Sequence, residues 1–153
     1  MKKLIACAVA LVLSFCAFAA AANTDKATVK EAEGMVKKAI EYYKKNGKEK
    51  SLPEFSKMPG PFVDRDVYVT VYNEAGDCLA HINPKMVNKN MMDLRDADGK
   101  YHIKERMESS RKGTSGWQDI AFFNPVSKKI EPKRIYWERY DNLVFAAGAY
   151  KPE

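Results

Sequence analysis

Apolar residues recur every three or four positions between residues 24 and 46, and lysines and glutamates fill most positions between them. This spacing gathers the apolar side chains on one face, so the pattern predicts a long amphipathic helix over 24–46. Thr28 followed by Glu31 fits a capping box, and Thr24 is an alternative start. Gly47 stands where helices commonly end.

A short second helix is predicted from Ser51, and from Asp66 the pattern changes to alternating β-branched and aromatic residues, which favour strands. The strands over 67–72 and 78–82 flank a glycine-containing turn and are expected to form a hairpin. A polar segment and a further helix then precede three strands separated by short turns. These elements cover 101–112, 116–123, 130–140 and 143–150. The order predicts an α+β domain with a central antiparallel sheet of about five strands.

The N-terminal segment has a different pattern. Lys2 and Lys3 precede an uncharged apolar run over 4–18, and small residues follow as far as Ala22. This arrangement is typical of a cleavable secretory signal, so we predict a signal peptide over 1–22 and one domain over 23–153. Cleavage is expected between Ala19 and Asn23, which gives a periplasmic or secreted protein. The alternative is an uncleaved N-terminal anchor, because the run over 4–22 nearly reaches the length of a membrane span.

Charge and cysteine content narrow the classes of partner. The chain has 26 basic and 20 acidic residues, and the lysines are spread along it. Together with the export signal, this spread argues against a nucleic-acid partner and favours small anions. Once the signal is removed, Cys78 is the only cysteine, so we expect no internal disulfide and no cysteine-based metal site. Cys78 has apolar neighbours and is predicted to be buried and unreactive.

The sequence offers few residues for catalysis or metal binding. The common hydrolase, metalloprotease and nucleotide-binding motifs are absent. Cys78 and His81 are three positions apart on a predicted strand, so their side chains should point to opposite faces. Asp96 and Asp98 suggest a calcium loop, but Leu94 occupies the first ligand position. We therefore expect a polar turn in which Asp98 caps the next helix, and we predict no enzyme activity, no metal and no cofactor.

Lys133 is the most informative polar residue, because it lies inside a predicted strand. A lysine in a central strand would need an anion to compensate its desolvated ammonium group. Spacing alone favours the simpler alternative, a lysine on a solvated edge or face. His81, Trp117 and Tyr136 also occupy strand positions, where aromatic side chains usually belong to the core.

Short motifs follow one another in a characteristic order between Phe62 and Tyr150, which resembles the single Cache domains that serve as extracytoplasmic sensors in chemoreceptors and histidine kinases. The predicted N-terminal helix also fits this family. The motifs are DVYV at 66–69, Gly76 in the turn, AHINP at 80–84, DGK at 98–100, GW at 116–117, NP at 124–125, PKRIY at 132–136 and AGAY at 147–150.

The resemblance implies a PAS-like fold with a ligand pocket between the sheet and the segment after the second strand. Ligands of such domains are commonly small carboxylates, and the matching positions here are Tyr68, His81, Trp117, Lys133 and Tyr136. A lysine would neutralise a carboxylate, while tyrosine and histidine donate hydrogen bonds and tryptophan excludes water. Lys133 and Tyr136 differ by three positions, so a β-bulge would be needed for both to face one pocket.

Two departures from the family pattern affect the prediction. Ile120 and Phe122 stand where aromatic residues, including a tryptophan, are expected, which affects the ligand class. No second apolar span and no kinase region follow Tyr150, so we expect a stand-alone domain. The resulting interpretation is an exported, non-catalytic protein that binds a small organic anion and acts with a membrane receptor or kinase. The alternatives are a protein-binding adaptor with a filled pocket and a small periplasmic enzyme.

Overall fold

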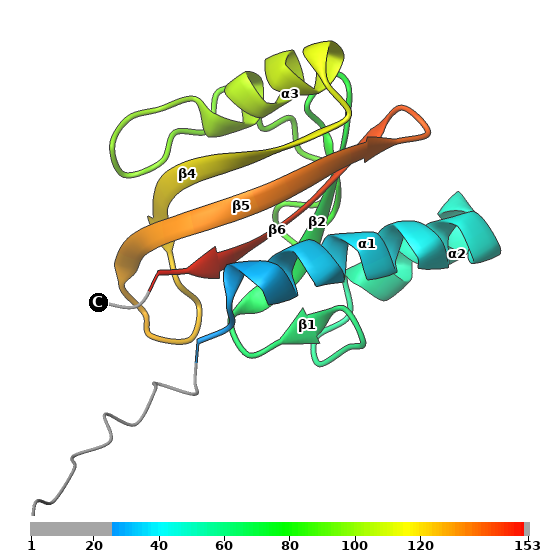
Figure 1. Cartoon of the computed structure of the whole chain (residues 1–153), viewed down its shortest axis with the longest axis horizontal. Coiled ribbons are helices and arrows are strands. Elements are labelled where there is room, and N and C mark those ends of the chain that lie inside the picture. Colours follow the sequence, from blue (N-terminus) through cyan, green and yellow to red (C-terminus); the bar gives the residue numbers. More distant parts are fainter. Residues whose placement is uncertain (1–25, 152–153) are drawn as a thin grey trace, which may run out of the picture.

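The structure is a computed structural model that describes residues 26–151, so the predicted signal peptide lies outside the described residues. Within these residues, three helices and six strands follow one another along the chain (Figure 1). The helices are α1 (Val29–Asn46), α2 (Lys48–Phe55) and α3 (His102–Lys112). The strands are β1 (Val63–Asp64), β2 (Val67–Asn73), β3 (Cys78–Ala80), β4 (Ser115–Phe123), β5 (Ile130–Tyr140) and β6 (Leu143–Tyr150).

Helix α1 begins where the capping box predicts. The Thr28 side chain accepts a hydrogen bond from the Glu31 backbone N–H, and the Glu31 carboxylate accepts one from the Thr28 backbone. These reciprocal bonds satisfy two backbone donors that would otherwise lack partners at the start of the helix. Gly47 ends α1 and immediately precedes α2. Its φ is 76°, a value that residues with a Cβ atom rarely adopt. Thr28 is thus the helix cap, as the first of the two alternatives predicts.

The strands form one antiparallel sheet in the order β1-β2-β6-β5-β4, and β3 pairs with the C-terminal part of β2. The predicted α+β class, antiparallel sheet and β2–β3 hairpin are therefore confirmed. The additional strand, β1, is only two residues long and pairs with β2 through a tight turn. Such a short strand has no alternating pattern to detect, which explains why the sequence predicted five strands.

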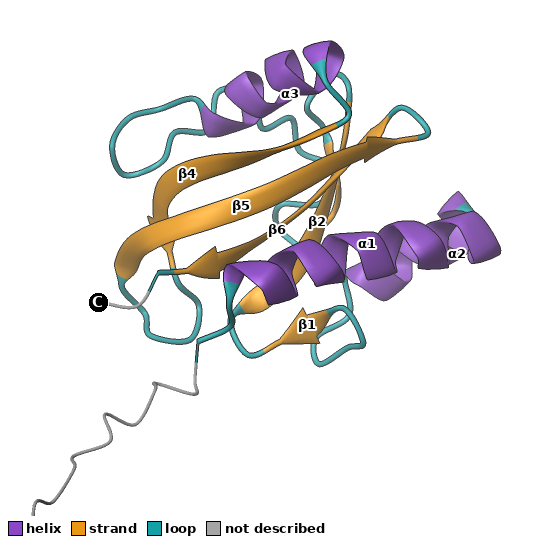
Figure 2. Cartoon of the chain, viewed as in Figure 1, coloured by secondary structure: helices purple, strands orange, loops and turns teal. Residues whose placement is uncertain are grey.

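The two faces of the sheet are covered by different layers. Helix α1 lies along one face, while α3 and the segment between β3 and α3 cover the other (Figure 2). Every residue of β6 is buried, because the strand lies in the middle of the sheet between these layers. Alternate residues face opposite layers: Phe145 packs into the α1-side core, and Val144 packs into the α3-side core.

Candidate functional site

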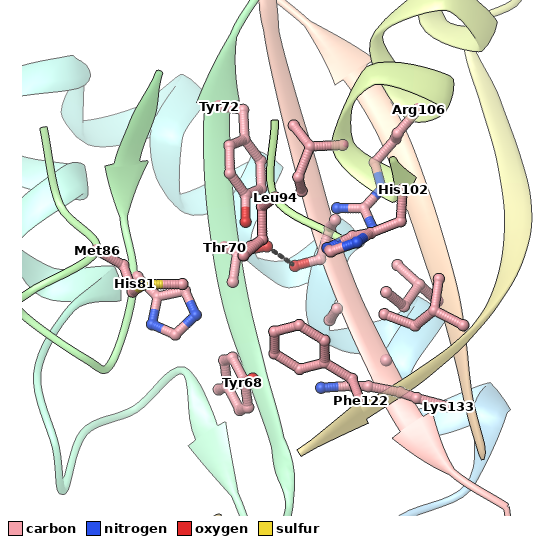
Figure 3. Close-up of a pocket in the computed structure, with 16 residues that line it drawn as sticks. Tyr68, Thr70, Tyr72, His81, Met86, Leu94, His102, Arg106, Phe122 and Lys133 are labelled. Carbon is pink, nitrogen blue, oxygen red and sulfur yellow. Dashed lines mark hydrogen bonds between the residues drawn. The ribbon is translucent and has the colours of Figure 1, made fainter. Parts of the chain in front are cut away.

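A cavity lies on the α3 side of the sheet, and most of its polar lining comes from residues that are distant in sequence. Figure 3 shows the lining side chains, which come from β2, β4, β5, β6, α3 and the segment between β3 and α3. The space for water-sized molecules inside is about 40 Å³, which corresponds to about three water molecules. The titratable and hydrogen-bonding side chains include Tyr68, His81, His102, Arg106 and Lys133.

Lys133 brings a buried amine to this cavity from the middle of β5. The residue is only 4% exposed. Its Nζ lies 4.3 Å from the centre of the Tyr68 ring and 4.4 Å from that of Tyr150, and it donates a weak hydrogen bond of 3.4 Å to the Tyr150 hydroxyl. The electron-rich ring faces attract the ammonium group and partly replace its lost hydration. Two aromatic rings therefore hold the end of this side chain.

Burial lowers the pKa of Lys133 to about 7, although the negative charge of Asp66 acts in the opposite direction. Among residues 26–151, no carboxylate oxygen lies within 4.0 Å of the Lys133 amine nitrogen, so the lysine forms no ion pair there. Near neutral pH, a small change in the electrostatic environment of this amine would therefore determine whether it carries a proton.

Gly148 on β6 provides the space for the Lys133 side chain. A Cβ atom at Gly148 would lie 2.7 Å from Lys133 Cε and 2.7 Å from Ile135 Cγ1, which is closer than real contacts allow. The missing side chain lets the lysine cross over β6 towards the Tyr68 ring on β2 (Figure 3). The AGAY motif therefore has a packing role in the site.

Arg106 on α3 supplies a second buried cation to the lining, and the sequence analysis did not identify it. The residue is 2% exposed, and its Nε and Nη2 donate hydrogen bonds of 3.1 and 3.0 Å to the Gln118 side-chain oxygen. Burial lowers its pKa from the usual value. A signal was present in the sequence, because Arg106 lies three positions after the inward-facing Ile103 and beside Met107.

Two histidines in the lining are held neutral. Burial, and secondarily the charge of Lys133, lowers the pKa of His81 to about 4. Burial and the charge of Arg106 have the same effect on His102, whose pKa is also about 4. His81 Nδ1 accepts a hydrogen bond from the Asn83 backbone N–H, so the proton of the neutral ring is on Nε2. His102 Nδ1 is buried without a hydrogen-bond partner among the described residues.

The structure brings together three of the five predicted site residues. Tyr68, His81 and Lys133 line the cavity, and the Tyr68 and His81 rings meet edge to face with centres 5.3 Å apart. This grouping combines a cation with two hydrogen-bonding rings, in a lining whose remaining surface is largely aliphatic and aromatic. Lys133 is thus buried, contrary to the solvated position that spacing alone favours.

Trp117 and Tyr136 lie on the opposite face of the sheet. The β4–β5 register is continuous from residue 115 to residue 138, without the bulge that would turn Tyr136 towards Lys133. The two residues are partners across the strands, with ring centres 5.0 Å apart, and Trp117 is 39% exposed. Tyr136 belongs to the α1-side core. A ligand-binding role for either residue remains a prediction, and this cavity gives it no support.

The structure also shows the environment of Cys78, Asp96 and Asp98, which the sequence analysis considered for catalysis, metal binding or helix capping. Cys78 is fully buried, as predicted, and burial raises its thiol pKa to about 11. The carboxylate of Asp96 accepts hydrogen bonds from the backbone of Asp98 and Lys100, so it holds a polar turn. Asp98 does not cap α3, whose first cap is Tyr101 without a side-chain bond. Asp96, and not Asp98, therefore supplies the side chain that stabilises this segment, because its carboxylate points back into its own turn.

Within residues 26–151, no three histidine, cysteine or carboxylate side chains are close enough together to hold a metal ion. A search of the same residues finds no helix that combines the length and the apolar character needed to span a membrane.

The comparisons with known proteins point to one family. A family model described as Single Cache domain 2 matches residues 1–147. No curated protein matches the chain. A methyl-accepting chemotaxis protein from Vibrio parahaemolyticus is similar in structure, with 23% identity over 79% of this chain and 86% of that one and a TM-score of 0.68.

Two further solved structures share the fold. The periplasmic sensor domain of a chemotaxis protein has 21% identity over 81% of this chain and 90% of that one, with a TM-score of 0.61. A Cache chemosensory domain, solved to explain carboxylic acid recognition, has 16% identity over 81% and 88% of the two chains and a TM-score of 0.63. At these identities the likeness shows the fold.

Proposed function

Because this chain belongs to the single Cache domain 2 family, whose members are sensory domains, we propose that it is an exported, non-catalytic sensor that binds a small organic carboxylate. The observation that carries the proposal is the buried amine of Lys133, which faces a cavity and has no carboxylate in ion-pair contact among the described residues. A carboxylate ligand would supply that missing charge through a charge-assisted hydrogen bond.

The rest of the lining suits the same ligand class. Arg106 contributes a second positive charge, and the neutral ring of His81 offers a proton on Nε2. Aliphatic and aromatic side chains make up much of the remaining lining, which suits the carbon end of an organic acid. A related Cache domain of known structure recognises carboxylic acids. These features together support a carboxylate over a neutral or cationic metabolite.

The size of the cavity limits the ligand. A space of about 40 Å³ holds about three water molecules. An acid of two or three carbon atoms would fit after small movements of the lining, whereas a tricarboxylate would require the layers to separate. The same small volume keeps one competing function open, that of an adaptor whose filled cavity only stabilises a protein-binding surface. A ligand screen distinguishes the two.

We further propose that the domain passes its ligand state to a membrane receptor or kinase. Two proteins that share its fold support this proposal: one is a methyl-accepting chemotaxis protein, and the other is the periplasmic sensor domain of a chemotaxis protein. The proposal names a class of partner, and a crosslinking experiment with and without the identified ligand would test it.

The ligand proposal is tested in two steps with the exported protein. The melting temperature is first measured with acetate, propionate, pyruvate, succinate and citrate, with acetamide as the uncharged match for acetate. We expect a short monocarboxylate to stabilise the protein, because a ligand at 100 times its Kd adds about 2.7 kcal/mol to the free energy of unfolding. Acetamide should have no effect. If no acid in the panel binds, the carboxylate proposal is wrong.

The second step is calorimetric titration of the parent, Lys133→Met and Lys45→Met with the acid that binds. Lys133→Met keeps the side-chain length and removes the charge, so the affinity should fall by about tenfold to a hundredfold. Lys45 is exposed on α1 and serves as the matched control, which should bind like the parent. Equal affinities for all three proteins would remove Lys133 from the site.

A further inference from the structure

The turn between β4 and β5 exposes an unusual concentration of apolar side chains. Phe123 is 48% exposed, Val126 53% and Ile130 63%. Phe123 and Ile130 are direct partners across the two strands, and Val126 lies in the turn that joins them. We call residues 123–130 the tip. Large apolar side chains that lie together at the surface indicate an interaction site more often than single ones do.

The tip is held firmly by buried polar groups, so its exposed side chains are not the result of a loose loop. Asn124 is 1% exposed, and its side-chain oxygen accepts a 2.9 Å hydrogen bond from the Val126 N–H while its amide donates to Glu131 at 2.9 Å. The Tyr150 hydroxyl donates a 2.6 Å hydrogen bond to the Phe123 carbonyl. These contacts fix the backbone and leave the apolar side chains directed outwards.

The charge of the tip favours an anionic partner. Lys128 and Lys129 are exposed beside the apolar side chains, and neither belongs to an ion pair among residues 26–151. Glu131, the nearest carboxylate in sequence, is buried and paired with Lys26 at 3.1 Å. Apolar side chains flanked by lysines suit the boundary between lipid headgroups and acyl chains, where the apolar groups insert and the lysines meet anionic headgroups.

The position of the tip indicates which partner this is. Lys26 bonds to Glu131 and to the Lys151 carbonyl, and the Lys151 N–H donates to the Pro132 carbonyl at 2.9 Å. Figure 1 shows the β4–β5 turn, the start of α1 and the end of β6 at the same end of the molecule. In the sequence, only three residues separate Lys26 from the apolar run over 4–22. In the alternative form that keeps this run as an uncleaved anchor, so short a separation would hold the tip close to the bilayer, and in the cleaved form the tip itself supplies the contact.

We propose that the tip is a membrane-contact surface that binds the outer leaflet of an anionic lipid bilayer. Phe123, Val126 and Ile130 enter the interfacial region, and Lys128 and Lys129 contact the anionic headgroups. This contact orients the domain with both ends of its described chain towards the membrane. It is independent of the ligand in the cavity, so it holds whether or not the proposed carboxylate binds.

The test uses a fluorescent probe whose emission rises in an apolar environment. The full chain carries Cys7→Ala and Cys16→Ala, which leaves the buried Cys78 unlabelled under native conditions. The probe is attached to Val126→Cys in one variant and to Lys45→Cys, exposed near the far end of α1, in the control. Vesicles of phosphatidylcholine with phosphatidylglycerol are then added, and brominated acyl chains are used as quenchers. The same labels report contact whether the segment before Lys26 is retained or removed.

We expect a severalfold rise in emission at Val126→Cys, quenched by brominated lipid, and little change at Lys45→Cys. High salt, or vesicles of phosphatidylcholine alone, should reduce the response because the lysine contribution is screened or absent. Lys128→Gln with Lys129→Gln should weaken vesicle binding by about tenfold or more, since each lysine near an anionic surface contributes roughly a fivefold change. Phe123→Ser with Ile130→Ser should reduce the response at Val126→Cys further.

An unchanged signal at Val126→Cys, or equal responses at both labels, would overturn the proposal. A signal that rises with membranes prepared from cells but not with lipid vesicles would assign the tip to a membrane protein and equally overturn it. The serine variants alter only exposed side chains, so an unchanged melting temperature confirms that any lost response reflects lost contact.

Discussion

The two faces of the sheet share six strands but differ in what they bury. The α1 face holds an apolar core in which aromatic rings pack edge to face, including Phe145 with Tyr43 at 5.5 Å and with Phe55 at 6.1 Å. The α3 face buries two cations, Lys133 and Arg106, and two neutral histidines around a small cavity. The first arrangement stabilises the fold through apolar burial. The second buries charged groups, whose desolvation is unfavourable, so the α3 face is expected to contribute less to stability.

The largest effect is expected on the α1 face. Phe145→Ala removes a fully buried ring from the middle strand, and truncations of this kind reduce the free energy of unfolding by about 3–5 kcal/mol. Urea denaturation at neutral pH measures the change. Lys133→Met on the same sheet should leave the protein as stable as the parent, or more stable. A large loss in Lys133→Met and a small one in Phe145→Ala would reverse the comparison.

The next effect concerns pH and the α3 face. Folding lowers the pKa of Lys133 from its usual 10.5 to about 7, so between these values the unfolded chain holds more protons than the folded one. Stability attributable to this residue therefore rises with pH through that window, by about 2 kcal/mol between pH 7 and pH 9. Lys133→Met lacks this rise. The free energy of unfolding of both proteins is measured by urea denaturation across this pH range. A constant difference between the parent and the variant would show that the lysine is not desolvated.

The same lysine titration makes ligand binding depend on pH. A bound carboxylate favours the ammonium form and raises the pKa of Lys133, so the complex holds more protons than the free protein above pH 7. Affinity should consequently fall as the pH rises above 7. Calorimetry at pH 8 in buffers of different ionisation enthalpy should detect the uptake of nearly one proton by the parent and none by Lys133→Met. Proton uptake that persists in the variant would have to come from another group.

How far the sequence predicts each face follows from the kind of pattern that each contains. The α1 face follows largely from periodicity and capping: the Thr28 box and the bounds of β5 and β6 agree with prediction. Helix α1 ends at Asn46 as predicted, but it begins at Val29 and not at residue 24. These features are local, so neighbouring residues determine them. The two-residue strand β1 carries no such pattern, and only its pairing with β2 defines it.

The cavity is predicted less completely, because it depends on contacts between distant residues. Tyr68, His81 and Lys133 were found through a family resemblance, whereas Arg106 was missed because an arginine within a polar helix usually faces solvent. Here the residue lies on the buried stripe of α3, where Gln118 accepts its hydrogen bonds. Trp117 and Tyr136 illustrate the opposite case, since a strict two-residue alternation along β4 and β5 places them on the α1 side.

A smaller effect is expected at Gly148, which lines the cavity on the α3 side of β6. In Gly148→Ala the new Cβ would overlap Lys133 Cε, so the lysine must withdraw from the Tyr68 ring. We expect affinity for the carboxylate to fall about tenfold in calorimetric titration. In the Lys133→Met background the same change should have a much weaker effect, because the two positions are coupled through contact. Additive losses in the double variant would mean that Gly148 acts independently of the lysine.

The smallest effect is expected at Trp117, and it tests the assignment of faces directly. The side chain is partly exposed on the α1 side, its ring is tilted by 57° against that of Tyr136 with Arg134 over its face, and it is absent from the cavity lining. Trp117→Ala should therefore change the affinity for the carboxylate by less than about twofold, within the range of a surface change of less than about 0.5 kcal/mol. Tyr68→Phe, on the cavity side, is the companion variant: it retains the ring that faces Lys133 and removes only a hydroxyl. A tenfold loss in Trp117→Ala, with Tyr68→Phe unaffected, would move the binding site to the α1 face and restore Trp117 and Tyr136 as ligand-binding residues.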